Sequence, residues 1–163
     1  METIWAPWRI DYIKGEKEEG CIFCNKPKEN DDRKNLILYR GSTGFIIMNR
    51  YPYSNGHLMA VPYRHISEMS ELSSEEKLEL MNLSTLSMEI LKPMNTEGFN
   101  VGLNLGRAGG AGIDDHIHFH IVPRWSGDTN FMPVIGGTKV MPEYLDDTYK
   151  VLSQQLHSME DEQ

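Results

Sequence analysis

Three histidines alternate with apolar residues in one short run, a pattern that few folds accommodate. Residues 115–122 read Asp-His-Ile-His-Phe-His-Ile-Val. Successive side chains of a β-strand point to opposite faces, so the run predicts a strand with His116, His118 and His120 on one face, about 6.6 Å apart. The apolar residues between them are expected to face the core. We expect the imidazoles on an exposed face, because burial would leave ring nitrogens in need of partners.

Other periodic segments predict the elements around this strand. Ser73-Ser-Glu-Glu76 is a capping-box pattern, and apolar residues then recur at helical spacing until Lys92-Pro93 interrupts them. A second helix is predicted over 142–157, where apolar residues recur in steps of three and four. Short β-rich runs bounded by turn residues predict strands over 35–40, 44–49, 57–61, 99–105 and 116–122, the last ended by Pro123. This order predicts an α+β fold with an antiparallel sheet of about five strands and two helices.

Length and charge limit the classes of protein to consider. The 163 residues, 39% of them apolar, are enough for one packed domain. We expect a single domain over 1–163, with an N-terminal extension over 1–30 and a C-terminal helix and tail over 142–163. A net charge of −8 provides no protein-wide positive field, so no nucleic-acid partner is expected. Without a bilayer-length apolar run or a signal-peptide layout, the chain is expected to be cytoplasmic and to have no membrane partner.

The residues alone leave three interpretations of the histidine run open. The imidazoles are chance surface groups, or they bind a metal from one face, or the central one is a nucleophile that its neighbours orient. The preceding stretch favours a phosphorus electrophile. Asn104 is followed by a loop with four glycines in residues 106–112, whose backbone can approach a ligand closely and turn amide hydrogens toward phosphate oxygens. Placed directly before three histidines, this loop indicates a phosphate-binding catalytic site.

The histidine run, together with the glycine loop before it, resembles the histidine-triad (HIT) family, whose signature is His-x-His-x-His followed by two apolar residues. The likeness extends upstream to Asn49, Asn55-Gly-His57 and Val61-Pro-Tyr-Arg-His65. Trp5-Ala-Pro-Trp-Arg9 and Cys21-Ile-Phe-Cys24 are similar to the branch that includes diadenosine tetraphosphate phosphorylases and related hydrolases. These motifs span residues 1–125, and the remainder of the chain matches less distinctively.

The resemblance implies nucleotidyl transfer in two displacements. The middle histidine, His118, would form a covalent nucleotidyl-imidazole intermediate. His120 would bond the phosphate and aid the leaving group, and His116 would hold the geometry of the nucleophile, directly or through a metal. The chemistry of the residues agrees, because a neutral imidazole is a usable nucleophile near pH 7 and fixed backbone donors stabilise charge on phosphoryl oxygens.

The resemblance also implies where the nucleotide binds. Asn49 would lie at the ribose. Asn104 would lie near the phosphates, with the loop that contains Gly110 and Gly112. Stacking on adenine is a further possible role of the tryptophans, although such residues more often lie in a core or a subunit interface. They are Trp5, Trp8 and Trp125.

The two cysteines, Cys21 and Cys24, form a Cys-x-x-Cys motif. In a reducing compartment this spacing suggests a metal site or a redox pair more than a structural disulfide. Two thiolates cannot fill a tetrahedral zinc site, and the candidate further ligands are His65 and His116. The resemblance supports this set, since some histidine-triad relatives bind structural zinc through such a pairing. Two buried free thiols and a redox pair are the alternatives.

Several functions fit this combination of motifs. The first is cleavage of dinucleoside polyphosphates, diadenosine tetraphosphate above all, with an adenine nucleotide as ligand. An adenosine 5'-phosphoramidase or mononucleotide hydrolase is the alternative, although that branch carries Ser or Thr where Ile113 and Asp114 stand. A nucleotide-binding module without turnover and a zinc hydrolase with three histidine ligands are further rivals. The family commonly pairs subunits, so a homodimer or higher homo-oligomer is expected through the helix that begins near Ser73.

Overall fold

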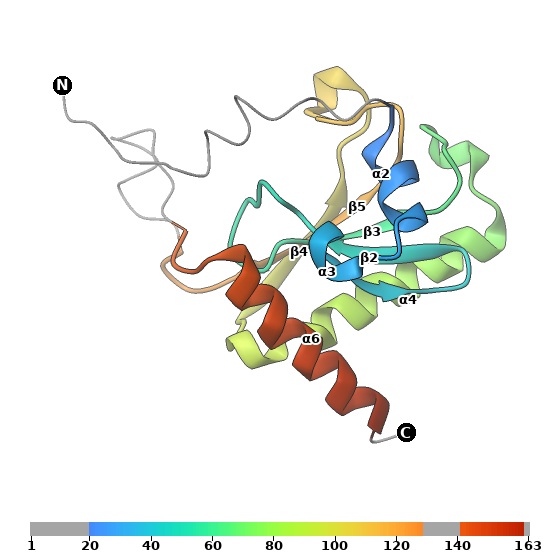
Figure 1. Ribbon diagram of the computed structural model, residues 1–163. Coiled ribbons are helices and arrows are strands. Elements are labelled where there is room, and N and C mark those ends of the chain that lie inside the picture. The colour runs from blue at the N-terminus through green and yellow to red at the C-terminus, as the bar shows by residue number, and fades with distance from the viewer. Residues whose placement is uncertain (1–19, 129–140, 162–163) are drawn as a thin grey trace.

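A computed structural model of the chain describes residues 20–128 and 141–161. They form a five-stranded antiparallel sheet in the order β1-β2-β3-β5-β4, with helices packed against it (Figure 1). The strands are β1 Ile37–Arg40, β2 Gly44–Met48, β3 Leu58–Pro62, β4 Gly98–Leu103 and β5 Phe119–Arg124. The helices are α2 Ile22–Asn25, η1 Lys26–Lys28, α3 Asp32–Asn35, η2 Met69–Glu71, α4 Ser74–Ile90, η3 Lys92–Met94, η4 Arg107–Gly109 and α6 Leu145–Asp161. This architecture confirms the predicted fold class.

The central strands β2 and β3 form the middle of the core. They pair along their whole length, with Phe45 opposite Val61 and Ile46 opposite Ala60. Every residue of both strands is buried, which explains why they read as continuous apolar runs rather than as alternating ones. Helix α4 packs against β2, β3 and β5, and α6 packs against β1 and α4. Among the described helices, none is long and apolar enough to cross a membrane.

The histidine strand begins three residues later than the sequence predicts. β5 starts at Phe119, so His116 and His118 lie in the segment that leads into it. This segment is still held to the neighbouring chain, because the amide of Ile117 donates to the carbonyl of Ile66 at 2.7 Å. The predicted alternation nevertheless holds on the apolar side, where Ile117 and Ile121 are buried in the core.

The prediction that Pro123 ends this strand is wrong. Pro123 lies inside β5, opposite Phe99 of β4. The nitrogen and the carbonyl of one strand residue point to the same side, and the Pro123 carbonyl accepts a hydrogen bond from Ser54 Oγ at 2.8 Å. The Pro123 nitrogen therefore faces the turn over 53–56 rather than β4. The proline removes no hydrogen bond from the β4–β5 ladder, and the strand continues.

The predicted capping box starts α4 and also braces the loop that follows β3. Ser73 Oγ accepts from the Glu76 amide at 3.1 Å, and the Glu76 carboxylate accepts from the Ser73 amide at 2.8 Å. The same carboxylate is buried and forms a two-pronged pair with Arg64, at 2.6 and 2.7 Å. The hydrogen bonds from Arg64 lower the pKa of Glu76 to about 2. This pair anchors the residue that precedes His65.

Helix α6 extends from Leu145 to Asp161. It begins three residues later and ends four residues later than the predicted span over 142–157. Its buried Leu152 and Leu156 join the core. In its first turn the buried Thr148 hydroxyl lies 2.6 Å from a Glu143 carboxylate oxygen and 3.1 Å from the Asn55 side-chain carbonyl. The start of α6 therefore holds the turn that immediately precedes β3.

Part of the predicted domain organisation falls on residues outside the described ranges. These include most of the N-terminal extension, with Trp5 and Trp8, and the end of the C-terminal tail. The division of the chain into one domain with two terminal additions therefore stays a prediction.

Candidate active site and metal centre

The three triad histidines are buried, and the expectation of an exposed face is wrong. His116, His118 and His120 are 1%, 6% and 8% exposed. Each ring has a partner that satisfies one of its nitrogens: a backbone carbonyl for His116 and for His118, and a second imidazole for His120. Burial is tolerable because these partners are present, and those of His116 and His120 come from segments distant in the sequence, which no local pattern reveals.

His118 is held in the form of a nucleophile. Its Nδ1 lies 2.8 Å from the His116 carbonyl oxygen. A carbonyl only accepts, so Nδ1 carries the ring hydrogen and Nε2 keeps its lone pair. Burial lowers the pKa of His118, and the ring is neutral at pH 7. The Phe23 ring contacts it at a centroid distance of 4.9 Å and the His120 ring meets it edge-on at 4.8 Å, so its orientation is restricted on two sides.

His57, to which sequence reasoning assigned no role, completes the site. It is 1% exposed, and its Nε2 lies 2.9 Å from Nδ1 of His120. The Tyr53 amide donates to His57 Nδ1 at 3.1 Å, so the hydrogen of the neutral His57 ring is on Nε2 and is donated to His120. His120 Nδ1 then accepts, and its own hydrogen lies on Nε2. The signal for this residue was its place in the Asn55-Gly-His57 turn motif.

His120 is therefore a neutral donor at physiological pH. Burial, with a smaller contribution from His118, lowers the pKa of His120 to about 4. The ring carries one hydrogen, and the preceding bond from His57 places it on Nε2. A donor with a fixed hydrogen can act on a developing negative charge without first losing or gaining a proton.

The two predicted substrate-binding asparagines lie beside these histidines. Asn49 Nδ2 lies 3.3 Å from His57 Nδ1, and its side-chain carbonyl accepts from the Tyr51 amide at 2.9 Å. Asn104 Nδ2 lies 3.4 Å from His120 Nε2 and donates to the Tyr53 hydroxyl at 3.2 Å. Residues from the ends of β2 and β4 thus meet at the histidine cluster.

The glycine loop folds more tightly than the sequence predicts. Gly106 and Gly110 adopt positive φ angles of 66° and 86°, which glycine adopts at little cost. The amides of Gly109 and Ala111 donate to the Gly106 carbonyl, and the amide of Gly110 donates to Arg107. These three amides close the loop's own turn, so they do not form the predicted anion nest. A role for Gly110 or Gly112 at the phosphates stays a prediction.

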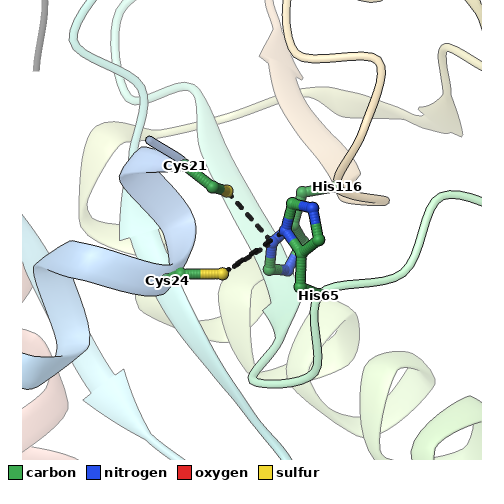
Figure 2. Close-up of side chains that lie close together, drawn as sticks. All are labelled: Cys21, Cys24, His65 and His116. Atoms are coloured by element: carbon green, nitrogen blue, oxygen red, sulfur yellow. Dashed lines mark hydrogen bonds between the residues drawn. The ribbon is translucent and has the colours of Figure 1, made fainter. Parts of the chain in front are cut away.

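A second cluster joins the two cysteines to two histidines, as predicted (Figure 2). Cys21 is the N-cap of α2, and Cys24 lies within this helix. His65 follows β3, and His116 precedes β5. Their ligand atoms all lie within 4.8 Å of one another. The separations are 3.3 Å for Cys21 Sγ to His116 Nδ1, 3.6 Å for Cys24 Sγ to the same nitrogen, and 3.4 Å for Cys24 Sγ to His65 Nδ1.

These separations fit a tetrahedral zinc ion. Zn–S and Zn–N bonds of about 2.3 and 2.05 Å at tetrahedral angles place a sulfur and a nitrogen ligand about 3.6 Å apart. The outer ring nitrogens are also occupied as they are in zinc sites. His116 Nε2 donates to the Pro62 carbonyl at 2.9 Å, which leaves Nδ1 without a hydrogen, and His65 Nε2 faces the Asp115 carboxylate at 3.7 Å.

Trp125 and two arginines of the neighbouring segments lie in ordinary structural contacts. Trp125 donates from its indole to the Met94 carbonyl, while Arg107 and Arg124 pair with Asp114 and Asp128. A hollow of about 390 Å³ lies between β1 and α6, beside Tyr39 and Tyr149, and includes none of the triad histidines. The chemistry of the described residues is therefore concentrated at the two histidine clusters, which share the segment from His116 to His120.

Comparison with known proteins supports the family resemblance of the sequence. Residues 30–127 match the HIT domain. The chain is 38% identical to AP-4-A phosphorylase of Mycobacterium tuberculosis, over 94% of this chain and 83% of that protein. It is 32% identical to adenosine 5'-monophosphoramidase of Schizosaccharomyces pombe, over 64% and 74%.

A solved structure shows the same fold. The zinc-bound histidine triad family protein of Mycobacterium smegmatis superimposes with a TM-score of 0.71 at 18% identity, over 88% of this chain and 98% of that one. The domain match, the long alignment to a phosphorylase and the geometry of the buried triad agree. This chain belongs to the histidine-triad (HIT) family.

Proposed function

We propose that this protein cleaves dinucleoside polyphosphates, with diadenosine tetraphosphate as substrate, through a nucleotidyl intermediate on His118. The observation that carries the proposal is the tautomer of His118, whose Nδ1 hydrogen is tied to the His116 carbonyl while Nε2 keeps a lone pair. The alignment to a diadenosine tetraphosphate phosphorylase over 94% of the chain supports the substrate class. Related HIT members named for triphosphatase and phosphoramidase activities also act on adenosine phosphates.

The reaction follows from this arrangement as two displacements. His118 Nε2 attacks the α-phosphorus, a P–N bond forms, and the P–O bond to the departing polyphosphate breaks. His120 Nε2–H donates a hydrogen bond to the oxygen that gains charge. A second nucleophile then breaks the P–N bond and releases His118: inorganic phosphate yields ADP, and water yields AMP. The other product is ATP in both cases.

The substrate contacts in this proposal use residues around the same cluster. Asn49, held against His57, is placed at the ribose. Asn104, which lies beside His120, is placed at the phosphates, together with the loop that contains Gly110 and Gly112. No residue of this set carries a formal charge, so in this proposal the substrate contacts are hydrogen bonds from uncharged donors.

Product analysis tests the proposal directly. Incubation with diadenosine tetraphosphate and inorganic phosphate is expected to give ADP and ATP in equal amounts, because the phosphorylase relative aligns over almost the whole chain. ATP and AMP formed without phosphate would instead identify water as the second nucleophile. Faster turnover of adenosine 5'-phosphoramidate than of the dinucleotide would support the alternative suggested by the phosphoramidase relative. Tight nucleotide binding with no product would support a binding module.

We also propose a structural zinc ion on Cys21, Cys24, His65 and His116. The support is the proximity of the four ligand atoms, the three sulfur–nitrogen separations of 3.3 to 3.6 Å and the partners of the outer ring nitrogens. Burial raises the pKa of the Cys21 thiol, so zinc binding would release a proton from it. The ion would anchor α2 and the start of the histidine segment, and His118 would remain outside its coordination sphere.

A homodimer is the proposed assembly. Among the described residues β4 lies at an edge of the sheet, and its Val101 is 45% exposed. On α4, Leu78 and Met81 are 64% and 55% exposed. An unpaired edge and apolar side chains on a long helix are features that a second copy can cover. Sedimentation equilibrium is expected to give about twice the chain mass of 18.7 kDa, and a concentration-independent single-chain mass would contradict the proposal.

A further inference from the structure

Tyr53 lies in the site without a role in the reaction described above. It belongs to the turn between β2 and β3, and its side chain is 47% exposed. Its ring stacks on His57 at a centroid distance of 4.7 Å and an angle of 29°, and it also contacts His120 at 5.4 Å. A large aromatic side chain thus covers the histidine pair while about half of it faces solvent.

The turn that carries Tyr53 is held from several sides. The Tyr53 amide donates to His57 Nδ1 at 3.1 Å, and the next residue, Ser54, bonds to the Pro123 carbonyl of β5. Asn55 is bonded to Glu143 and Thr148 at the start of α6. With its amide and both following residues bonded, the position of the Tyr53 backbone is determined by β5, α6 and His57 together.

The hydroxyl of Tyr53 is oriented by Asn104. Asn104 Nδ2 donates to the phenolic oxygen at 3.2 Å, so this oxygen acts as an acceptor in that bond. A phenol can donate one hydrogen and accept at its oxygen at the same time. Within residues 20–128 and 141–161, the bond from Asn104 is the one hydrogen bond that the hydroxyl forms. Its own hydrogen can therefore be donated to a ligand.

This hydrogen lies beside the other donors of the site. The same Asn104 nitrogen is 3.4 Å from His120 Nε2, the atom that donates toward the departing oxygen. Both nitrogens carry hydrogens in this tautomer, so they do not bond to each other and each can donate to a ligand. His120 Nε2–H, the Tyr53 hydroxyl and the Asn104 amide together form a group of uncharged donors. Such a group suits the non-bridging oxygens of a phosphate chain, which accept several hydrogen bonds at once.

We infer that Tyr53 is a specificity-determining residue, whose hydroxyl donates to a phosphate oxygen of the departing polyphosphate. The inference rests on the proposed function, because His120 marks the departing side of the attacked phosphorus. The ring and the hydroxyl then have separate tasks. The ring packs on His57 whatever the substrate, and the hydroxyl acts only when the departing group carries phosphate.

The test compares two substrates that share the AMP moiety. The group that leaves diadenosine tetraphosphate is a polyphosphate, whereas the group that leaves the p-nitrophenyl ester of AMP is a phenolate without phosphate. For Tyr53→Phe, kcat/KM for diadenosine tetraphosphate is expected to fall about 10- to 100-fold, the range for a hydrogen bond to a charged group, and that for the ester to change less than about 3-fold. Tyr53→Leu, which also removes the ring, is expected to reduce both.

Tyr39→Phe is the matched control, since it removes the same hydroxyl from β1, at the opposite edge of the sheet from β4. It is expected to leave both rates unchanged. Equal losses with both substrates for Tyr53→Phe, or no loss with either, would overturn the inference. Failure of the wild-type protein to cleave either substrate would instead remove the proposed function, so the two failures are distinguishable.

Discussion

Replacing His118 with asparagine is expected to reduce cleavage of diadenosine tetraphosphate by about 10³-fold or more, with the fold retained. The substitution removes the Nε2 lone pair that forms the P–N bond, and no other group can take its place. Asparagine can still donate to the His116 carbonyl, as His118 Nδ1 does at 2.8 Å. Initial rates measured by chromatography of the nucleotides, alongside a thermal melt, test both halves of this expectation.

His157→Asn provides the matched control for this experiment. His157 is exposed on α6, and its ring bonds to the Ser153 carbonyl of its own helix. The same substitution there is expected to leave turnover unchanged. A folded His118→Asn protein that retains the wild-type rate would contradict the covalent mechanism. Mass spectrometry of the wild-type protein quenched during turnover is expected to show an AMP adduct, and the variant is expected to show none.

Loss of the metal is expected to lower stability far more than it lowers the intrinsic reactivity of His118. Purified protein should contain about one zinc per chain, and His65→Gln should lose it. Structural zinc contributes several kcal/mol to folding, which for a chain of this size lowers the melting temperature by about 10 °C or more. Atomic emission for metal content, and melting curves with and without a chelator, measure the two quantities.

The same experiment separates a structural ion from a catalytic one. At a temperature where the metal-free protein stays folded, a structural ion allows substantial turnover to remain, because His118 is outside the proposed ligand set. Complete loss of activity in the folded, metal-free protein would favour the zinc-hydrolase alternative. His157→Gln is the control, because it changes a histidine outside the cluster in the same way. Protein with no bound metal and an unchanged melting temperature would contradict the zinc proposal.

Local patterns were sufficient for much of the fold. The Ser73–Glu76 capping box starts α4 as predicted, because both of its hydrogen bonds are made between residues three apart. The β-rich runs that follow one another along the chain also become neighbouring antiparallel strands, β2 with β3 and β4 with β5. The errors lie where a distant segment intervenes. β5 continues through Pro123 because the carbonyl of this residue, and with it the nitrogen that cannot donate, faces Ser54 rather than β4.

The candidate site divides in the same way. The Cys-x-x-Cys motif and the family resemblance together suggested Cys21, Cys24, His65 and His116 as one metal set, and the four residues lie together in the structure. The sequence could not show that the triad is buried, because the partners of the His116 and His120 rings come from β3 and from the turn before it. Nor could residue types and spacing assign a role to His57 or Tyr53. His57 contacts His120 and Tyr53 contacts Asn104, and each contact joins residues about 50 to 60 positions apart.

The sequence by itself determined the repertoire of chemical groups: three alternating imidazoles, two further histidines upstream and a pair of thiols. Only the tertiary structure decided which nitrogen of each ring carries the hydrogen. A neutral imidazole takes the tautomer that its partner requires, and those partners are the His116 carbonyl for His118, the Pro62 carbonyl for His116, and His57 for His120. The lone pair of His118 Nε2, the lone pair of His116 that faces the two cysteines and the hydrogen on His120 Nε2 all follow from these three hydrogen bonds.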